Sequence, residues 1–292
     1  MNVLIVGANG QLGNELKVTA GPEFKVTALG RDQLDISNQP QVEQVSDRYR
    51  PRLVINAAAY TAVDKAEQEP ELAYRINRDG VTNLAAACHK IGARLIHIST
   101  DFVFDGCQST AYKPTDTVNP LGCYGESKYA GEQALKASGL NDYLIVRTAW
   151  VYSSFGGNFV KTMLRLMAEK ESLGVVADQI GTPTYARELA RVIWKMASQT
   201  ELKGVLHWTD AGVASWYDFA VAIQEEALKL GLLEAPIPIN PISTDAYPTP
   251  AKRPAYSVLD KTDTWDQLQC PAVHWRIQLR QMLTVLARQD AS

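Results

Sequence analysis

The sequence predicts an α/β protein in which a Rossmann-like, doubly wound parallel sheet carries a smaller, discontinuous lobe. Two observations support this fold class. Short apolar runs alternate with stretches of helical periodicity through the first half of the chain, which is typical of parallel strands joined by right-handed helical crossovers. A glycine-rich turn also follows the first apolar run, at the place where such sheets bind dinucleotides.

Composition argues against several functional classes. The chain has 292 residues, of which 46% are hydrophobic and 21% are charged, enough for one large domain with a smaller lobe. The net charge of -3 provides no basic field for nucleic acid. No apolar run approaches the ~20 residues of a membrane span, and the N-terminus shows no signal-peptide pattern. We therefore expect a cytoplasmic protein with no nucleic-acid or membrane partner.

The cysteines and histidines show no metal-binding pattern. The four cysteines contain no Cys-x-x-Cys spacing, and the four histidines contain no pair at helical i, i+4 spacing. We therefore expect reduced, mostly structural thiols and no metal site.

The first strand and helix frame the glycine-rich turn. Residues 3–6 read as a buried strand that stops at the turn, and residues 11–19 read as a helix. The glycine spacing G-x-x-G-x-x-G is a variant of the dinucleotide fingerprint, in which the helix N-terminus faces a pyrophosphate. A glycine-rich turn without a ligand is the alternative. The residues expected to bind the cofactor here are Gly7, Asn9, Gly10, Gln11, Leu12 and Gly13.

The second strand, residues 24–29, ends at Gly30-Arg31-Asp32. A residue just past this strand usually meets the adenosine ribose, and an Arg there suits the 2′-phosphate of NADPH. Arg31 therefore favours NADPH, whereas Asp32 keeps NADH possible, and a solvated loop Arg is the alternative. Asp35 and Ile36 are expected to flank the adenine.

The next two strands deliver small and hydroxyl-bearing residues to the same sheet edge. We expect a helix over residues 40–50, a strand over 53–59, a long helix over 71–91 and a strand over 94–98. The third strand ends in small residues, against which a flat cofactor can lie, and the fourth leads to Ser99-Thr100-Asp101. The cofactor-binding residues expected after the third strand are Ala57, Ala58, Ala59 and Tyr60.

A helix over residues 124–138 precedes a further strand over 143–147. Tyr124 and Lys128 lie about one turn apart on that helix. A free phenol has a pKa near ~10, and a nearby ammonium favours the phenolate, so such a pair can exchange a proton with a substrate oxygen. On spacing alone, an exposed helix that carries this pair by chance is the alternative.

The order of these features resembles the extended short-chain dehydrogenase/reductase family, whose catalytic set is Ser/Thr, Tyr and Lys. More specific strings resemble one branch of it, the dTDP-4-dehydrorhamnose reductases, and they spread over nearly the whole chain. They occupy residues 56–67, 99–106, 147–152, 157–159, 178–184 and 253–257.

The resemblance implies a reaction and its residues. It implies reduction of the C4 ketone of dTDP-4-dehydro-β-L-rhamnose to dTDP-L-rhamnose, with hydride from NADPH or NADH. Tyr124 would protonate the developing alkoxide, and Thr100 would hydrogen-bond the ketone oxygen. Lys128 would hold the nicotinamide ribose and lower the Tyr124 pKa.

The second half of the chain is expected to recognise the substrate. The expected elements are a helix beginning within residues 156–166, a strand over 173–177, a loop over 178–185, a helix over 188–197, a strand over 204–208, a helix over 216–230 capped by Ser215, an ordered loop over 236–254 and a closing helix over 273–286. We expect residues 1–150 to form the NAD(P)-binding domain and residues 151–292 mainly the lobe. Parts of 151–180 and 209–275 would build the lobe, and elements near 181–208 would return to the sheet.

Several residues are candidates for substrate contacts. Trp150 and Asn158 lie at the entry to the lobe, and Arg253 follows the long loop, where it would clamp a diphosphate. Core packing is the alternative for Trp150, and a structural salt bridge is the alternative for Arg253. The stripe of Trp216, Phe219, Ile223 and Ala227 is expected to be core. The expected substrate-binding residues are Thr61, Val63, Thr100, Phe102, Trp150, Asn158 and Arg253.

Two positions depart from the pattern of the branch. Phe102 stands where many relatives have Tyr, which removes one hydroxyl from the sugar site. Some relatives form a dimer through magnesium held by glutamates, and Glu15 fits that pattern, but Arg187 stands where a second carboxylate is expected. An Arg repels a cation, so we expect a monomer or a weak homodimer without the metal.

Two alternative functions remain open at this level. One is another nucleotide-sugar reductase or an epimerase, although an epimerase often has an acid where this chain has Gly30-Arg31. The other is a non-catalytic, NADP-binding regulatory subunit of the methionine adenosyltransferase type. The intact set of Thr100, Tyr124 and Lys128 favours catalysis.

Overall fold

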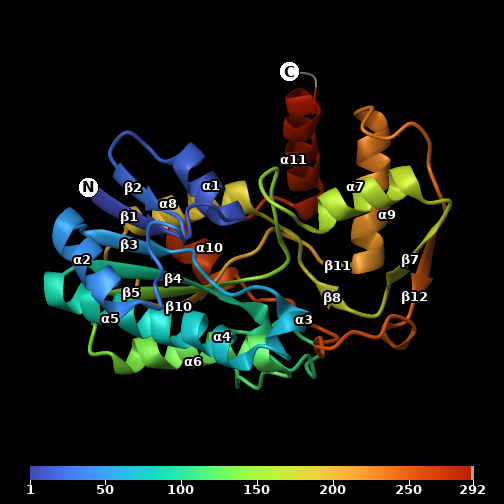
Figure 1. Ribbon diagram of the computed structural model, residues 1–292. Helices are drawn as coiled ribbons and strands as arrows, with labels where there is room; N and C mark the ends of the chain where they lie inside the picture. Colours follow the sequence, from blue (N-terminus) through green and yellow to red (C-terminus); the bar gives the residue numbers. More distant parts are fainter. Residues whose placement is uncertain (291–292) are drawn as a thin grey trace.

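The computed structural model describes residues 1–290 and is centred on a six-stranded sheet (Figure 1). In spatial order its strands are β10 (Gly204–His207), β5 (Tyr143–Thr148), β4 (Arg94–Thr100), β3 (Leu53–Asn56), β1 (Asn2–Val6) and β2 (Lys25–Leu29). All neighbouring strands of this sheet run parallel. The chain leaves β1 toward β2 on one side and returns to β3 on the other, so the carboxyl ends of β1 and β3 form the topological switch point.

Two layers of helices bury both faces of the sheet. On β1, Val3 and Ile5 pack under one layer and Leu4 and Val6 under the other, because successive side chains of a strand point to opposite faces. This is why the first strand is an uninterrupted apolar run in the sequence. The first layer consists of α1 (Gln11–Thr19), α8 (Ala186–Ser198) and α10 (Thr262–Leu268), and the second of α2 (Gln39–Tyr49), α5 (Gly80–Ile91) and α6 (Cys123–Ala137). The doubly wound parallel sheet predicted from the sequence is confirmed.

The third strand is shorter than the sequence predicts. The expected strand over residues 53–59 stops at Asn56, whose carboxamide accepts a hydrogen bond from the backbone N–H of Ala58 at 3.1 Å. The backbone of residues 57–59 therefore leaves the ladder at the sheet edge.

The predicted long helix over residues 71–91 is interrupted. It consists of α4 (Pro70–Tyr74), a π-helical segment (Arg75–Asp79) and α5, preceded by the short helix α3 (Val63–Ala66). In the π-helical segment, Asn77 accepts from the backbone N–H of Tyr60 at 2.8 Å and donates to the Ser127 hydroxyl at 3.0 Å. Such π-bulges often occur at functional sites. Here the segment fixes the backbone near Tyr60 to helix α6, which carries Tyr124 and Lys128.

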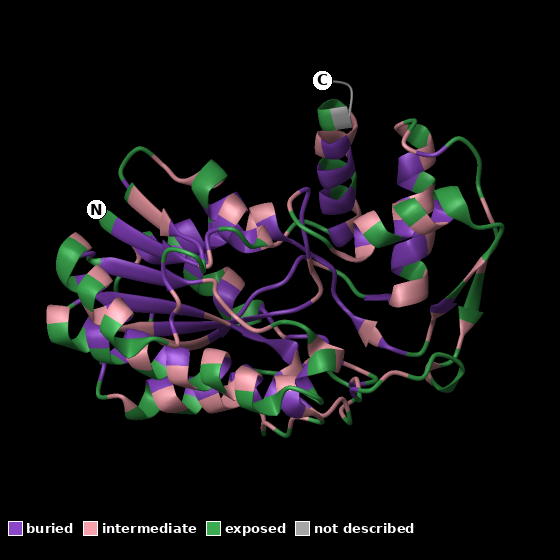
Figure 2. Ribbon diagram, viewed as in Figure 1, coloured by how far each residue is buried: buried purple, intermediate pink, exposed green. Residues whose placement is uncertain are grey.

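A second core lies beside the sheet. It is built from α7 (Phe159–Glu169), α9 (Trp216–Lys229), α11 (Trp275–Asp290) and the parallel strands β7 (Leu173–Val176) and β12 (Ile239–Ile242). In Figure 2 the buried sides of these three helices face one another. Ser215 caps α9 with a capping box that includes Asp218, as the sequence predicts for the cap.

Short strands join this lobe to the sheet. β6 (Val151–Tyr152) pairs with β9 (Thr184–Tyr185), and β8 (Ile180–Gly181) pairs with β11 (Ala214–Ser215). The segments 178–185 and 236–254 were both expected to be loops, and this was wrong in part, because β8 and β9 lie in the first and β12 in the second. β12 was missed because Pro241 interrupts its pattern, and proline is tolerated there since the strand has only one partner.

The assignment of elements to the sheet or to the lobe differs in detail from the expected division of the chain. α8 and β10 pack with the sheet, and so does Leu268 of α10, whereas α11 packs in the lobe although it lies beyond residue 275. We retain as a proposal the division into a nucleotide-binding domain over residues 1–150, with 181–208 returned to it, and a lobe within 151–292. Over the described part of the chain, no helix combines the length and the apolar character needed to cross a membrane.

Candidate active site

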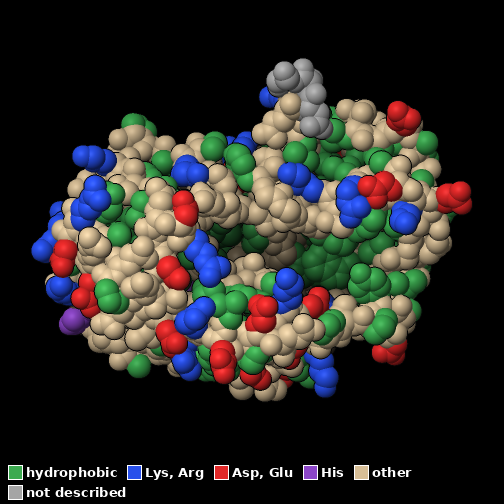
Figure 3. Space-filling view, in the orientation of Figure 1, with side chains coloured by type: hydrophobic (Ala, Val, Ile, Leu, Met, Phe, Trp, Pro, Cys, Tyr) green, Lys and Arg blue, Asp and Glu red, His purple; other side chains and the backbone are tan. Residues whose placement is uncertain are grey.

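A cavity of about 690 Å³ opens at the carboxyl edge of the sheet, beside the switch point. Figure 3 shows the molecule hollowed there, with hydrophobic side chains on the side of the lobe and Lys or Arg at the rim. Most of the site residues predicted from the sequence line this cavity: Asn9, Gly10, Gln11, Leu12, Ala57, Ala58, Ala59, Thr61, Val63, Thr100, Phe102, Tyr124, Lys128, Trp150, Asn158 and Arg253.

The glycine turn has the geometry of a pyrophosphate cradle. Gly7 has a φ of +80°, and a Cβ there would lie 2.5 Å from the Ala58 nitrogen. A Cβ on Gly13 would lie 2.2 Å from the Gly7 carbonyl oxygen, so only glycine lets α1 start this close to β1. Gly10 begins α1 without a side-chain cap, so the first N–H groups of the helix are not used by a capping side chain. These features fit the phosphates of a dinucleotide.

Six of the predicted cofactor residues lie outside the cavity lining. Arg31 is exposed just past β2, and Ile36 is buried against α5, with its carbonyl accepting from Asn83 at 3.0 Å. Burial opposes ionisation of Asp35, but hydrogen bonds from Ser37 and the charge of Arg31 hold the pKa of that carboxyl below its usual value. Tyr60 donates its hydroxyl to Glu69 at 2.7 Å and does not line the cavity. The remaining two, Gly7 and Gly13, pack against the backbone of the chain around the turn.

The three catalytic candidates meet at the base of the cavity. Thr100 ends β4, and Tyr124 and Lys128 lie on the first turns of α6. Lys128 is buried, and its ammonium donates to the Ile98 carbonyl oxygen at 2.7 Å. Burial lowers the pKa of Lys128 to about 8, although Glu132 opposes this shift.

The Tyr124 phenol is held in its protonated form. Burial, opposed by the hydrogen bond with Thr100 and aided by the Asp101 carboxylate, raises the pKa of Tyr124 to about 12. The lowered pKa that the Tyr124–Lys128 spacing predicts is therefore wrong for this structure. The physical reason is that desolvation of the phenol dominates, while the Lys128 ammonium binds the Ile98 carbonyl. A protonated phenol beside a cavity is suited to donate a proton.

Close packing places helix α6 against the strand ends. A Cβ on Gly125 would lie 2.2 Å from the Phe102 carbonyl oxygen, and one on Gly131 would lie 2.1 Å from the Asn77 carbonyl oxygen. Gly125 thus lets α6 approach the segment after β4, and Gly131 lets it approach the π-helical segment. The Phe102 ring meets the Tyr124 ring edge-on, with centroids 5.5 Å apart.

Asp101 was not predicted from the sequence as a site residue. It is 1% exposed and lines the cavity, where its Oδ1 accepts from the Thr100 hydroxyl at 3.1 Å. Burial raises the pKa of Asp101 from 3.8 to about 6. The only sequence signal for it was its place directly after Thr100 at a strand end. Further cavity residues that were missed are Ile98, Ser99, Thr148, Ala149, Val151, Tyr152, Gly156, Gly157, Phe159, Trp216 and Phe219.

The raised pKa of Asp101 predicts a specific pH dependence of stability. The folded state binds this proton more tightly than the unfolded state, so the stabilisation is complete below pH ~4 and is lost as the pH rises through about 6. Asp101→Asn removes this term. Between pH 4 and 7 the wild type should lose about 3 kcal/mol of unfolding free energy that the variant does not lose. The difference in unfolding free energy, variant minus wild type, should therefore rise by this amount. Urea unfolding of both proteins across this range measures the difference, and parallel curves would contradict it.

An aromatic wall closes the lobe side of the cavity. The rings of Trp150 and Trp216 stack with centroids 3.5 Å apart and planes 5° apart, and Phe159 packs on Trp216. Trp150 has a φ of +47°, a left-handed backbone that a bulky residue rarely adopts. A Cβ on Gly181 would lie 2.6 Å from the Trp150 indole, so glycine is required to seat the ring. The stripe of Trp216, Phe219, Ile223 and Ala227 packs in the core of the lobe, as the sequence predicts, and Trp216 and Phe219 also line the cavity.

Two further predicted substrate residues, Arg253 and Asn158, already bind other parts of the chain. Arg253 forms a bidentate ion pair with Asp64, at 2.8 and 3.0 Å, and its guanidinium also donates to Thr249. The salt bridge considered as the alternative for Arg253 is thus present, and it holds the long loop against α3. Asn158 caps α7 by accepting from the Lys161 N–H at 3.2 Å. Helix α7 consequently begins at Phe159, within the segment 156–166 where the sequence predicts a helix start.

Arg187 contacts Glu15 within the same chain. Its Nε donates to the buried Glu15 carboxylate at 2.8 Å. Among residues 1–290, no three His, Cys, Asp or Glu side chains gather into a group that suits a metal ion.

The chain matches known proteins over nearly its whole length. The family described as the RmlD substrate binding domain matches residues 1–288. A dTDP-4-dehydrorhamnose reductase of Aggregatibacter actinomycetemcomitans is 43% identical over 285 residues, covering 95% of this chain and 97% of the relative. The crystal structure of a dTDP-4-dehydrorhamnose reductase of Bacillus anthracis in complex with NADP has a TM-score of 0.91 and 41% identity, covering 96% of this chain and 98% of that chain.

More distant structures share the architecture alone. A UDP-glucose 4-epimerase of Thermus thermophilus in complex with NAD has a TM-score of 0.82 at 20% identity and covers 99% of both chains. The full-length matches at about 40% identity confirm the branch that the sequence motifs indicate. The chain therefore belongs to the family of the RmlD substrate binding domain, together with the dTDP-4-dehydrorhamnose reductases.

Proposed function

We propose that the protein reduces the C4 ketone of dTDP-4-dehydro-β-L-rhamnose to dTDP-L-rhamnose with NADPH, the final step of dTDP-rhamnose formation. The observation that carries the proposal is the meeting of Thr100, Tyr124 and Lys128 in one cavity, beside a glycine turn shaped for a pyrophosphate. Relatives that match at full length are named for this reaction.

The chain's own residues supply binding, orientation and a proton. The dinucleotide supplies the hydride when bound, and the start of α1 would hold its phosphates. Lys128 would hold the nicotinamide ribose. Thr100 would donate a hydrogen bond to the ketone oxygen, and Tyr124 would transfer its phenolic proton to that oxygen as carbon C4 gains the hydride. The resulting phenolate would regain its proton from solvent.

The sugar and its diphosphate would meet the cavity wall opposite the glycine turn. Trp150, Phe102 and Val63 offer apolar surfaces, and Thr61 and Asn158 offer polar groups. Arg253 lines the same cavity while Asp64 fixes its guanidinium, and a fixed guanidinium loses little conformational freedom when it binds a diphosphate. We therefore retain the proposed diphosphate contact for Arg253.

The direct test is consumption of NADPH with dTDP-4-dehydrorhamnose, which is generated from dTDP-glucose by the upstream dehydratase and epimerase. We expect turnover, with the product identified as dTDP-L-rhamnose by mass and by NMR of the sugar. Tight NADPH binding without turnover would overturn the proposal and favour another nucleotide sugar or a regulatory role.

Arg31 is proposed to set the cofactor preference. Arg31→Ala should weaken NADPH binding about tenfold or more and leave NADH binding little changed. Only NADPH carries the 2′-phosphate on its adenosine ribose, which the guanidinium would bind bidentately. Fluorescence titration with both cofactors measures the two dissociation constants. Lys17→Ala is a matched control, since it removes a cation from α1 at the end remote from the glycine turn. An unchanged preference in Arg31→Ala would identify Arg31 as a solvated loop residue.

We also propose that the protein works in the cytoplasm as a monomer or a weak homodimer. A cytoplasmic location is consistent with the proposed use of NADPH and a nucleotide-activated sugar. The Glu15–Arg187 ion pair supports the proposal that no metal-bridged dimer forms, because the guanidinium occupies the carboxylate.

A further inference from the structure

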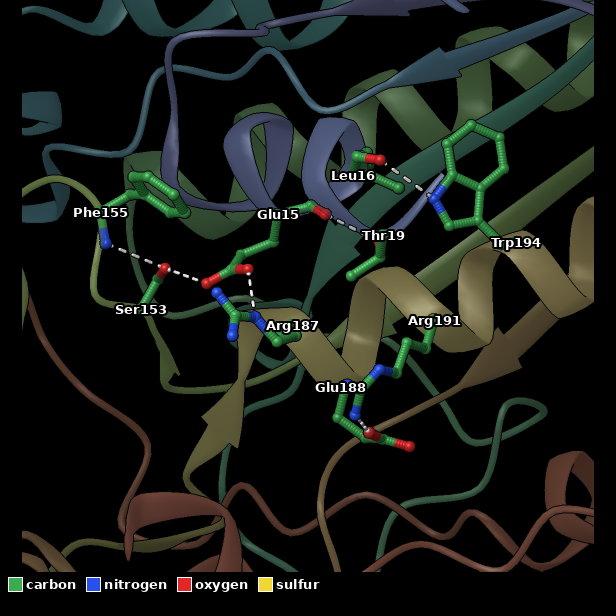
Figure 4. Close-up of polar contacts among 9 residues, drawn as sticks. All are labelled: Glu15, Leu16, Thr19, Ser153, Phe155, Arg187, Glu188, Arg191 and Trp194. Carbon is green, nitrogen blue, oxygen red and sulfur yellow. Dashed lines mark hydrogen bonds and ion pairs between the residues drawn. The ribbon is translucent and has the colours of Figure 1, made fainter. Parts of the chain in front are cut away.

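A buried polar cluster connects the cofactor helix to the wall of the cavity. Glu15, on α1, is fully buried, and its two carboxylate oxygens accept from different parts of the chain (Figure 4). One accepts from the Ser153 hydroxyl at 2.7 Å, and the other from Arg187 Nε at 2.8 Å. Ser153 is also fully buried, and its oxygen accepts from the Phe155 N–H at 3.1 Å. The Ser153 side chain is thereby held from both sides.

This contact fixes the segment 153–158, which we call the wall loop. The wall loop presents Gly156, Gly157 and Asn158 to the cavity and leads directly into α7. A second contact with the wall loop lies one turn earlier on α1, where Gln11 Oε1 accepts a hydrogen bond from Asn158 Nδ2 at 3.0 Å. Residues at i and i+4 lie on the same face of a helix, so Gln11 and Glu15 hold the two ends of the wall loop together.

The same helix begins at the glycine turn. Gln11 and Leu12 line the cavity where α1 starts, four residues before Glu15. Trp194 donates to the Leu16 carbonyl oxygen at 3.1 Å and so anchors α1 to α8. A group bound at the start of α1 therefore acts on a rigid helix whose next turn holds the wall loop.

We propose that Glu15 is a positioning residue for the nucleotide-sugar site: through Ser153 it ties the wall loop to the helix that carries the dinucleotide turn, so that cofactor binding orders one wall of the substrate cavity. The inference rests on the proposed function for the identity of the cofactor and of the nucleotide sugar. Arg187 neutralises the buried Glu15 carboxylate, and the hydrogen bond from Ser153 ties the wall loop to that carboxylate.

Hydrogen exchange read by mass spectrometry tests the link with NADP⁺ alone. In the wild type, saturating NADP⁺ should slow exchange of the amides in residues 153–158 by about fivefold or more, the lower range of measured site-to-site couplings. Ser153→Ala removes the hydroxyl and should abolish this slowing. Protection of residues 7–13 by NADP⁺ should remain, which shows that the cofactor still binds.

Glu15→Gln provides a second variant that nearly preserves the buried volume. Arg187 can only donate, so the amide of this variant keeps its oxygen toward Arg187 and turns its NH₂ toward Ser153. The Ser153 hydroxyl, which already accepts from the Phe155 N–H, must then accept this bond instead of donating it, and the tie to the wall loop is expected to weaken. The matched control is Glu188→Gln, which removes an ion pair with Arg191 on the same helix as Arg187, on a side that does not reach the wall loop (Figure 4). This control should behave as the wild type.

A binding measurement extends the test to the nucleotide end. Calorimetry of dTDP with and without NADP⁺ should give a dissociation constant at least about fivefold lower in the presence of NADP⁺ for the wild type, and a ratio near one for Ser153→Ala. Equal slowing of the wall loop in the wild type and Ser153→Ala would overturn the inference, as would an equal ratio. Failure of dTDP to bind either protein would instead overturn the proposed substrate, while the exchange experiment still decides the role of Glu15.

Discussion

Tyr124→Phe is expected to lower kcat with dTDP-4-dehydrorhamnose by about 10²–10⁴-fold, the usual contribution of a positioned acid. The variant loses one oxygen atom and keeps the ring that packs edge-on against Phe102. Burial raises the pKa of Tyr124 to about 12, so the wild-type phenol is protonated at neutral pH and has a proton to give. Phenylalanine has none, and water would have to replace it in a partly enclosed site.

The affinity for the cofactor separates this catalytic effect from damage to the fold. NADPH should bind Tyr124→Phe within about threefold of the wild type, because the glycine turn and Lys128 are unchanged. Tyr129→Phe is the matched control, since Tyr129 lies on the same helix but packs in a separate cluster with Val103 and Leu259. A kcat for Tyr124→Phe within about threefold of the wild type would show that another group delivers the proton.

The parts of the site that the sequence predicts share one property: local spacing determines them. Gly7 and Gly13 are required by the contact between a strand and the helix that follows it, which the order strand–turn–helix already implies. Tyr124 and Lys128 are separated by one helical turn wherever that helix lies. Their place in the cavity follows from the parallel sheet, which collects the carboxyl ends of its strands at one edge.

The parts that were missed depend on contacts between distant segments. Trp216 occupies a helical position that periodicity assigns to the core, and only the fold brings Trp150 against it. The pKa of Tyr124 follows from its burial in the fold, which the Tyr124–Lys128 spacing does not determine. Glu15 and Ser153 lie 138 positions apart in the chain, so no local pattern pairs them. The π-helical segment was also missed, and the side chain of its Asn77 bonds to Tyr60 and Ser127, which lie outside it.

Breaking the buried ion pair behind the active site is expected to destabilise the protein strongly. Arg147 is 1% exposed and Glu132 is 0% exposed, and two bonds of 2.7 and 2.9 Å join them. The same carboxylate accepts from the Ser99 hydroxyl at 2.6 Å, directly before Thr100, and lies one helical turn beyond Lys128. The pair thus fixes β4, β5 and α6 to one another beneath the catalytic residues.

Arg147→Met should therefore lower the free energy of unfolding by about 3–5 kcal/mol, because it leaves the Glu132 carboxylate buried without a countercharge. Urea unfolding at neutral pH measures this loss. Arg165→Met is the matched control: it removes an exposed ion pair with Glu169, and it should change stability by less than about 1 kcal/mol. The double variant Arg147→Met with Glu132→Leu should recover much of the loss, since the buried charge is gone. If Arg147→Met costs no more than Arg165→Met, or if the double variant is less stable than Arg147→Met alone, an uncompensated Glu132 charge is not the cause of the loss.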